Sequence, residues 1–289
     1  MTLKTRIISR LDIKGPNLVK GVHLEGLRVL GKPEKFARYY YQAGADELFY
    51  QDTVASLYNR NHLGELVRRT AQEIGIPMCV GGGLRTLADI RAVLRAGADK
   101  IAVNTGAVRN PDFIRQSAEA FGSSTIVVAI EVIRQPDGTP FCFVDNGRES
   151  TGLNAIEWAQ QVESLGAGEI LLTSVDREGT GNGFDIPLVK QIADLVNIPV
   201  IAHGGAGTAV HVADVIKKGH ADAVALASLL HYGVYAELAS DSDDFNAEGN
   251  TQFMKRNATN KRIKPVHLAD LKASLTSAGL PMRLPHAQT

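Results

Sequence analysis

Val80-Gly81-Gly82-Gly83 and Ala202-His203-Gly204-Gly205 are two versions of one turn. Each is followed by the start of a related strand, Ala98-Asp99-Lys100-Ile101 in the first case and Ala221-Asp222-Ala223-Val224 in the second. Self-similarity at a fixed spacing indicates a chain built from repeated units. The offset between the copies stays near 120 residues. The sequence therefore predicts two similar halves.

The repeat continues toward the N-terminus of each half. Gly44-Ala45-Asp46-Glu47-Leu48 parallels Gly166-Ala167-Gly168-Glu169-Ile170. Ile7-Ile8 followed by Asp12 likewise parallels Val127-Val128 followed by Glu131. Units one to four therefore resemble units five to eight.

Short β-rich runs alternate along the chain with segments of helical periodicity, such as residues 87–96, 155–165 and 186–195. The expected strands span residues 6–12, 47–52, 77–80, 100–104, 125–131, 169–174, 199–203 and 221–227. Unbroken apolar strands are typical of parallel sheets covered by helices, and eight such units close into a barrel. We predict an α/β fold, a single (β/α)8 TIM barrel made of two similar half-barrels, about 1–122 and 123–289. A doubly wound open sheet is the alternative, and the repeat favours the barrel.

Two segments interrupt this regularity. A Gln-Pro-Asp-Gly turn at residues 135–138 stands between apolar runs and predicts a β-hairpin insertion at about 132–145. Residues 236–262 are rich in Asp, Asn, Ser and Gly and form a polar insertion before a final helix near 266–277. Such a stretch is usually mobile or disordered. A lid or an oligomer contact is the alternative.

The composition excludes several classes of partner. Acidic and basic residues balance at 31 each, which gives no attraction to nucleic acid or to an anionic membrane. Cys79 and Cys142 lie in apolar runs, as buried reduced thiols do. The sequence shows neither the apolar stretch of a signal peptide nor a run of membrane-spanning length. We expect a cytoplasmic protein and assign it no metal and no cofactor.

The glycine-rich turns after the third and seventh expected strands are candidate phosphate sites. Without bulky side chains, backbone N–H groups can approach phosphate oxygens closely. The candidate phosphate-binding residues are Gly82, Gly83, Asn104, Thr105, Gly204, Gly205, Ala227 and Ser228. Glycines that merely permit tight turns are the alternative. Two sites related by the repeat favour a ligand with a phosphate at each end.

Asp12 and Glu131 end the first and fifth expected strands, on opposite sides of the barrel. Barrel enzymes carry their catalytic groups at these C-terminal strand ends. Two carboxylates facing a bound ligand can divide proton donation and acceptance, so both are catalytic candidates. A solvated acid at a loop start is the alternative for either one alone. Asp52 and the turn Glu178-Gly179-Thr180 are expected to shape the pocket or bind hydroxyl groups.

Charged residues also stand near four strand starts: Arg6, Glu47, Lys100 and Glu169. If all point inward, they form a neutral ring that closes the base of the barrel, since buried charges persist when they are paired. Ordinary surface charges are an equal alternative.

Together these motifs resemble the cyclase subunit of imidazole glycerol phosphate synthase, a family of histidine biosynthesis. The similarity covers about residues 6–235 and resumes at the final helix. It is carried by Leu11-Asp12-Ile13-Lys14, Val19-Lys20-Gly21, Asp46-Glu47-Leu48, Ala98-Asp99-Lys100, the segment from Gly166 to Ser174, and the two glycine-rich turns.

The resemblance implies a glutamine amidotransferase system. A separate glutaminase subunit docks at the N-terminal face of the barrel, and ammonia passes through the interior. The substrate, N-phosphoribulosyl formimino aminoimidazole carboxamide ribonucleotide, is phosphorylated at both ends and yields imidazole glycerol phosphate and aminoimidazole carboxamide ribonucleotide. The resemblance makes Asp12 a catalytic aspartate and Lys20 part of a mobile loop that closes over substrate. It places Asp99 at the glutaminase interface and makes Arg6, Glu47, Lys100 and Glu169 the ammonia gate.

Three positions depart from the family pattern. Glu131 and Glu178 stand where the family has aspartate, and Arg10 replaces a small residue. Arg10 has the strand parity of Asp12, so it should point into the barrel and find a partner there, with Asp52 or Glu131 as candidates. The departures leave two alternatives to the cyclase. One is an ammonia-using paralogue that acts on another phosphorylated or nucleotide-linked substrate, such as a surface-polysaccharide sugar. The other is a non-catalytic partner of a glutaminase.

Overall fold

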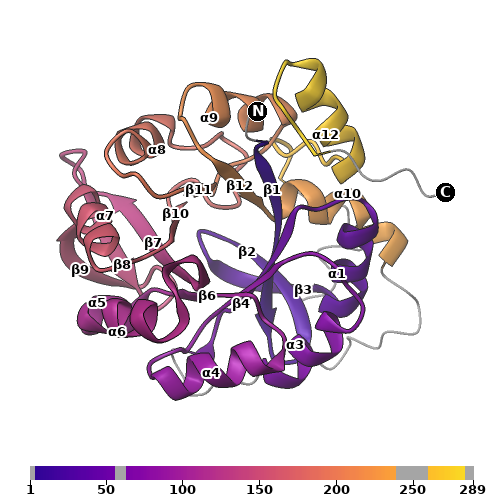
Figure 1. Cartoon of the computed structure of the whole chain (residues 1–289). Helices are drawn as coiled ribbons and strands as arrows, with labels where there is room; N and C mark the ends of the chain where they lie inside the picture. Colours follow the sequence, from indigo (N-terminus) through magenta and orange to yellow (C-terminus); the bar gives the residue numbers. More distant parts are fainter. Residues whose placement is uncertain (1–3, 56–62, 239–259, 284–289) are drawn as a thin grey trace.

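The computed structural model describes residues 4–55, 63–238 and 260–283. Within them, eight parallel strands follow the order β10-β11-β12-β1-β4-β5-β6-β7, and a pairing of β7 with β10 closes the ring. Figure 1 shows the molecule roughly down the barrel axis, with the ring of strands inside and the helices around it. The barrel strands are β1 (Arg6–Lys14), β4 (Glu47–Asp52), β5 (Met78–Gly81), β6 (Lys100–Val103), β7 (Ile126–Arg134), β10 (Glu169–Ser174), β11 (Val200–His203) and β12 (Ala223–Leu226). The predicted barrel is confirmed.

Helices surround the strands. They are α1 (Pro33–Gln42), α3 (Gly64–Ala71), α4 (Leu87–Ala96), α5 (Thr105–Arg109), α6 (Asp112–Phe121), α7 (Ala155–Ser164), α8 (Ile186–Ala193), α9 (Ala209–Lys217), α10 (Ser228–Leu238) and α12 (Leu268–Ser277), with a 3₁₀ turn at Ser123–Thr125. Several begin at a side-chain cap; Thr86 and Asp89, for example, form a capping box at the start of α4. No helix among the described residues has the length and apolar character needed to cross a membrane.

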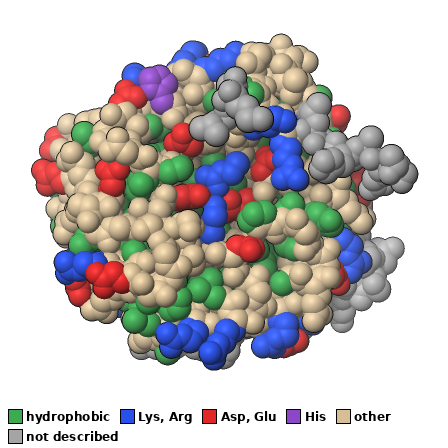
Figure 2. Space-filling model, viewed as in Figure 1, with side chains coloured by type: hydrophobic (Ala, Val, Ile, Leu, Met, Phe, Trp, Pro, Cys, Tyr) green, Lys and Arg blue, Asp and Glu red, His purple; other side chains and the backbone are tan. Residues whose placement is uncertain are grey.

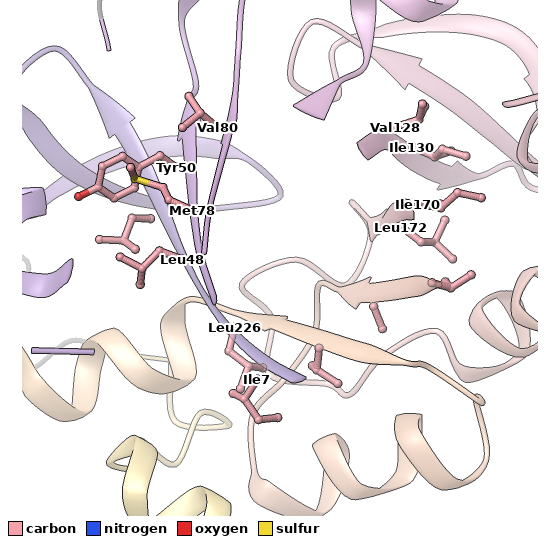
Figure 3. Close-up of a cluster of buried hydrophobic side chains, with 14 of the residues drawn as sticks. Ile7, Leu48, Tyr50, Met78, Val80, Val128, Ile130, Ile170, Leu172 and Leu226 are labelled. Carbon is pink, nitrogen blue, oxygen red and sulfur yellow. The ribbon is translucent and has the colours of Figure 1, made fainter. Parts of the chain in front are cut away.

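Alternation along each strand divides the core into an outer and an inner layer. Ile7, Leu48 and Tyr50 belong to the outer cluster between barrel and helices, part of which Figure 3 shows. Ile8 and Phe49, their neighbours in sequence, belong to the inner cluster that fills the barrel. Side chains of β1 with the parity of Ile8 therefore point into the barrel.

Antiparallel extensions continue β1 and β7 at their C-terminal ends. The first consists of β2 (Asn17–Val22) and β3 (Glu25–Gly31), and the second of β8 (Pro140–Val144) and β9 (Glu149–Asn154). The hairpin expected at 132–145 is formed by the end of β7 together with β8; β9 and the whole first extension were not predicted. Two consecutive non-glycine residues have positive φ at each tip, His23-Leu24 and Asp145-Asn146. The extensions thus repeat each other down to their turns, four strands apart around the ring.

Most of the polar insertion expected at 236–262 lies outside the described residues. On its near side α10 continues to Leu238. On its far side the Asn260 amide donates to the carbonyl oxygen of Thr180 at 2.6 Å, and Arg262 donates to Asn182 Oδ1 at 2.6 Å. The returning chain therefore packs on the loop after β10.

The C-terminal helix α12 is fixed to the N-terminal half by a buried lysine. Lys272 is fully buried, and its ammonium group lies 2.8 Å from Asp46 Oδ2. It also donates to the carbonyl oxygens of Gly44 at 2.6 Å and Arg283 at 2.8 Å. These partners satisfy a charge that has no access to water.

Candidate active site

The charged residues at the strand starts form a closed ring of ion pairs. Arg6 lies 2.8 Å from Glu47 and 3.1 Å from Glu169. Lys100 lies 3.0 Å and 2.8 Å from the same two carboxylates. Charged side chains of both signs gather in the middle of the face in Figure 2. The alternative of four separate surface charges is wrong, because each cation bridges both acids.

The residues of this ring are partly buried, and burial shifts their pKa values. Burial raises the pKa of Glu47, against the opposing effect of Lys100 and Arg6. Burial would lower the pKa of Lys100, but Glu47 and Glu169 outweigh it and raise that pKa. All four groups are therefore held in place by one another.

Arg10 lies farther up the barrel, above the apolar inner layer. Its guanidinium is 5.5 Å from the centroid of the Phe49 ring. Its Nε donates to Asp12 Oδ1 at 2.9 Å, and its Nη1 lies 3.3 Å from His203 Nδ1. Arg10 points inward as expected, but neither expected carboxylate pairs with it. Asp12 does, because residues two apart on a strand share a face, whereas Asp52 accepts the backbone N–H groups that begin the next turn.

The backbone at Arg10 is fixed from outside the barrel. His231 Nε2 donates to the carbonyl oxygen of Arg10 at 2.9 Å, and the Tyr40 hydroxyl lies 2.6 Å from His231 Nδ1. Because a carbonyl oxygen only accepts, Nε2 carries the ring proton and Nδ1 accepts from Tyr40. Burial lowers the pKa of His231 to about 4, so this chain of hydrogen bonds is uncharged at neutral pH.

Asp12 is a buried carboxylate between two cations. Besides Arg10, the ammonium group of Lys20 lies 3.6 Å from its second oxygen. Burial alone would raise the pKa of Asp12, but Arg10 and Lys20 outweigh it and lower the pKa to about 2. Asp12 is therefore an anion throughout the physiological range.

Glu178 fastens the first extension across the barrel mouth. One of its carboxylate oxygens accepts from Lys20 and the other accepts from the Leu24 amide at 3.0 Å. The carbonyl oxygen of Glu178 accepts from the His23 amide at 3.0 Å. Lys20 is only 2 % exposed and lies on strand β2, not in an irregular loop. Glu178 and Asp12 raise its pKa against the effect of burial.

Glu131, on the opposite side, has no such cation. It forms no ion pair among the described residues, and its Oε2 accepts from the Gly147 amide at 2.8 Å. Burial raises the pKa of Glu131 to about 7, although Arg10 opposes the shift. At neutral pH this carboxyl group populates both its protonated and its ionised form.

The expected phosphate-binding residues line two pockets, one in each half. The first pocket contains Gly82, Gly83, Asn104 and Thr105 with Asp52 and Glu131; the second contains Gly204, Gly205, Ala227 and Ser228 with Glu178, Gly179 and His203. Thr180 lies outside the second pocket, and its hydroxyl donates to the carbonyl oxygen of Arg177 at 2.6 Å.

Gly82 and Gly204 have a structural role in these turns. Their φ angles are 110° and 94°, and a Cβ atom would lie 2.5 Å from the carbonyl oxygen of Asp52 or of Ser174. Each turn thus requires glycine regardless of any ligand. The turn role of these glycines is therefore explained without a ligand, and whether they also bind phosphate stays a prediction.

The hydroxyl groups of the two pockets differ. Thr105 Oγ1 accepts from the Asp145 amide at 3.1 Å and lies 3.3 Å from Asp145 Oδ1. Ser228 Oγ is buried and has no hydrogen-bond partner among the described residues. Only the second pocket therefore presents an unsatisfied hydroxyl.

Comparison with known proteins places this fold and site in a family. The family described as "Histidine biosynthesis protein" matches residues 6–236. The chain belongs to that family. A protein of Legionella pneumophila, named imidazole glycerol phosphate synthase subunit HisF, is 57% identical over 202 residues, which cover 70% of this chain and 95% of that relative. The family match includes both carboxylates and both pockets.

Two parts of this histidine biosynthesis protein's site were not predicted. His203 stands directly before the glycines of one turn, and a single histidine there carries no spacing or motif that marks it as part of a site. Gly147 and Asn146 reach the site through the second extension, and the Asn146 amide donates to the carbonyl oxygen of Leu24 at 2.9 Å, joining the two extensions. Asp99 lies exposed at the opposite end, where its carboxylate accepts from the Met78 amide at 2.9 Å.

Proposed function

We propose that this chain is the cyclase subunit of imidazole glycerol phosphate synthase, an ammonia-dependent lyase of histidine biosynthesis. It converts N-phosphoribulosyl formimino aminoimidazole carboxamide ribonucleotide to imidazole glycerol phosphate and aminoimidazole carboxamide ribonucleotide. The observation that carries the proposal is the placement of two unlike carboxylates between two related pockets, in a chain 57% identical to a relative named for this subunit.

The two carboxyl groups suit different proton-transfer roles. Attack of ammonia on the ribulosyl carbonyl group forms a C–N bond, after which nitrogen loses protons and the carbonyl oxygen gains them to leave as water. Asp12, with a pKa of about 2, is available as an anion that accepts hydrogen bonds and stabilises positive charge. Glu131, with a pKa of about 7, can both donate and accept a proton near neutrality. We therefore assign the proton shuttle to Glu131 and charge stabilisation to Asp12.

Each pocket is a binding site for one phosphorylated end of the substrate. Their glycine-rich turns leave backbone close to the ligand, and Thr105 and Ser228 add one hydroxyl each. Lys20, on the first extension, pairs with Glu178 at the second pocket. The substrate enters when this extension opens.

We further propose that a glutaminase subunit docks at the N-terminal face, near the exposed Asp99, and that the ring of Arg6, Glu47, Lys100 and Glu169 is the ammonia gate. The ring lies at the strand starts, and the layer above it is apolar and includes the small side chains of Cys79, Ala102 and Ala223. Neutral ammonia crosses such a lining far more readily than ammonium does. The buried free thiols of Cys79 and Cys142 suit a reducing cytoplasm.

The assay that tests the proposal supplies purified protein with ammonium salt and the bis-phosphorylated substrate, without glutaminase. Imidazole glycerol phosphate and the carboxamide ribonucleotide should form in equal amounts, as measured by mass spectrometry. Absence of both products, in a protein whose melting curve shows it folded, would overturn the proposal and direct the search to other phosphorylated ammonia acceptors.

A further inference from the structure

His203 is a buried histidine that has no part in the roles assigned to Glu131 and Asp12 or in the ring of ion pairs. It ends strand β11, it shares the inward face with Ile201, and it is 4 % exposed. It lines the second pocket beside Gly204, Gly205 and Ser228. A side chain at this position can contact a ligand held by the glycine-rich turn.

The neighbours of His203 fix its tautomer. Arg10 Nη1 lies 3.3 Å from Nδ1, and a guanidinium can only donate, so Nδ1 is unprotonated. The Thr173 hydroxyl lies 3.2 Å from the same nitrogen. Burial, together with Arg10 and Lys20, lowers the pKa of His203 well below its usual value. The ring is therefore neutral and carries its proton on Nε2.

The second pocket thus contains two polar groups without partners. Among the described residues, nothing accepts a hydrogen bond from His203 Nε2, and Ser228 Oγ is likewise unpartnered. Buried polar groups normally find partners, so the buried, unpartnered Ser228 hydroxyl, next to the Nε2–H of His203 on the same pocket wall, indicates a ligand rich in acceptor oxygens. No lysine or arginine is among the described residues that line this pocket, which makes neutral donors important for anion recognition there.

We propose that His203 binds a phosphomonoester end of the substrate through Nε2–H, and that Arg10 is the positioning residue that directs this donor into the pocket. Arg10 also donates to Asp12, so one guanidinium links the phosphate end of the ligand to the catalytic anion. This inference rests on the proposed function, because it takes the two products as ligands.

Two substitutions separate the two nitrogens of His203. His203→Asn keeps an acceptor near Nδ1 for Arg10 but removes the Nε2 donor, whereas His203→Gln places an amide donor near Nε2. Each product is titrated into each variant by calorimetry. For His203→Asn we expect at least about tenfold weaker binding of one product and unchanged binding of the other, since a hydrogen bond to a charged group contributes about 1.4 kcal/mol or more and 1.4 kcal/mol is tenfold. The dissociation constant of His203→Gln for that product should stay within about threefold of the wild-type value.

Thr105→Val provides the matched control in the first pocket and should weaken binding of the other product only. Arg10→Met tests the positioning role by ¹⁵N NMR of the histidine ring. In that variant His203 should populate both tautomers and titrate nearer 6.5, so that product binding becomes dependent on pH between 5 and 8.

The outcomes are distinguishable. If the wild type is active but His203→Asn binds both products normally, the role of His203 is overturned while the cyclase assignment stands. If Arg10→Met leaves the tautomer unchanged, the positioning role is overturned. A wild type that binds neither product and makes none overturns the proposed function itself.

Discussion

The two sides of the barrel mouth share a scaffold and differ in charge. Each side has a strand with a carboxylate near its C-terminal end, an antiparallel extension whose tip holds two non-glycine residues of positive φ, and a pocket with a glycine-rich turn. On the side of Asp12 the extension brings Lys20 into the site. On the side of Glu131 it brings two uncharged groups, the Gly147 amide and the Asn146 side chain.

That difference shows how a repeated scaffold can give two distinct catalytic groups. Two cations hold Asp12 ionised, whereas burial without a cation holds the pKa of Glu131 near 7. Environments that separate the pKa values of two carboxylates are typical of acid–base pairs. Matched substitutions on the two sides should therefore have unlike effects on turnover, on stability and on closure of the first extension.

The largest effect is expected from Asp12→Asn in the ammonia-dependent assay. The variant keeps the shape of the side chain but leaves Arg10 and Lys20 without their shared anion. Because Asp12 stabilises charge electrostatically, we expect kcat to fall by about 10²–10³-fold. Arg85→Gln changes another charged residue that lines the first pocket and should reduce kcat far less. Comparable losses in both variants would contradict a special role for Asp12.

Glu131→Gln should change the pH dependence of stability. Between about 4.5 and 7 the folded chain holds the Glu131 proton that the unfolded chain has lost, so wild-type stability falls as pH rises through this window. The shift of the Glu131 pKa from 4.5 to about 7 corresponds to about 3 kcal/mol in the free energy of unfolding. Urea unfolding at pH 5 and pH 8 should show this loss in the wild type and not in Glu131→Gln.

Asp12→Asn is the control for this measurement. The lowered pKa of Asp12 makes its contribution disappear only as pH falls from about 3.8 toward 2, outside the window tested. The wild-type loss between pH 5 and 8 should therefore persist in Asp12→Asn. If both variants abolish it, the raised pKa of Glu131 is not its source.

A smaller effect is expected at the contact between Glu178 and Lys20, which holds the first extension over the barrel mouth. Glu178→Gln removes the charge that holds Lys20 while preserving an acceptor for the Leu24 amide. Hydrogen exchange at Leu24 should accelerate by about tenfold, and the KM for the bis-phosphorylated substrate should rise, since the closed extension loses about 1.4 kcal/mol or more. Glu149→Gln, an exposed change on the second extension, should leave both unchanged. Equal exchange rates in all three proteins would show that Glu178 does not control the extension.

Strand periodicity in the sequence was sufficient to predict the barrel and its inward-facing side chains. Apolar runs such as the one around Ile7-Ile8 placed the barrel strands within a few residues, and alternation placed Arg10 inside. The missed elements depend on other information. Hairpins are predicted from glycine-containing two-residue turns, and the tip of the first extension has none. Its turn is made by His23 and Leu24, which adopt a positive φ that such residues rarely adopt. The partner of Arg10 depended on side-chain packing across the barrel, which sequence order does not reveal.

The smallest predicted effect compares the hydroxyl groups of the two pockets in the free protein. Thr105→Val removes a group bonded to Asp145, whose amide is left without its acceptor, so the free energy of unfolding should fall by about 1 kcal/mol. Ser228→Ala removes a buried hydroxyl that has no partner among the described residues, so stability should stay unchanged or rise slightly. With ligand present the order should reverse for Ser228, because its hydroxyl then gains a phosphate oxygen and the wild type gains more stability than Ser228→Ala does. Melting curves with and without each product measure both effects. A Ser228→Ala variant that is destabilised without ligand would show that its hydroxyl is already satisfied, and the contrast between the two pockets would be lost.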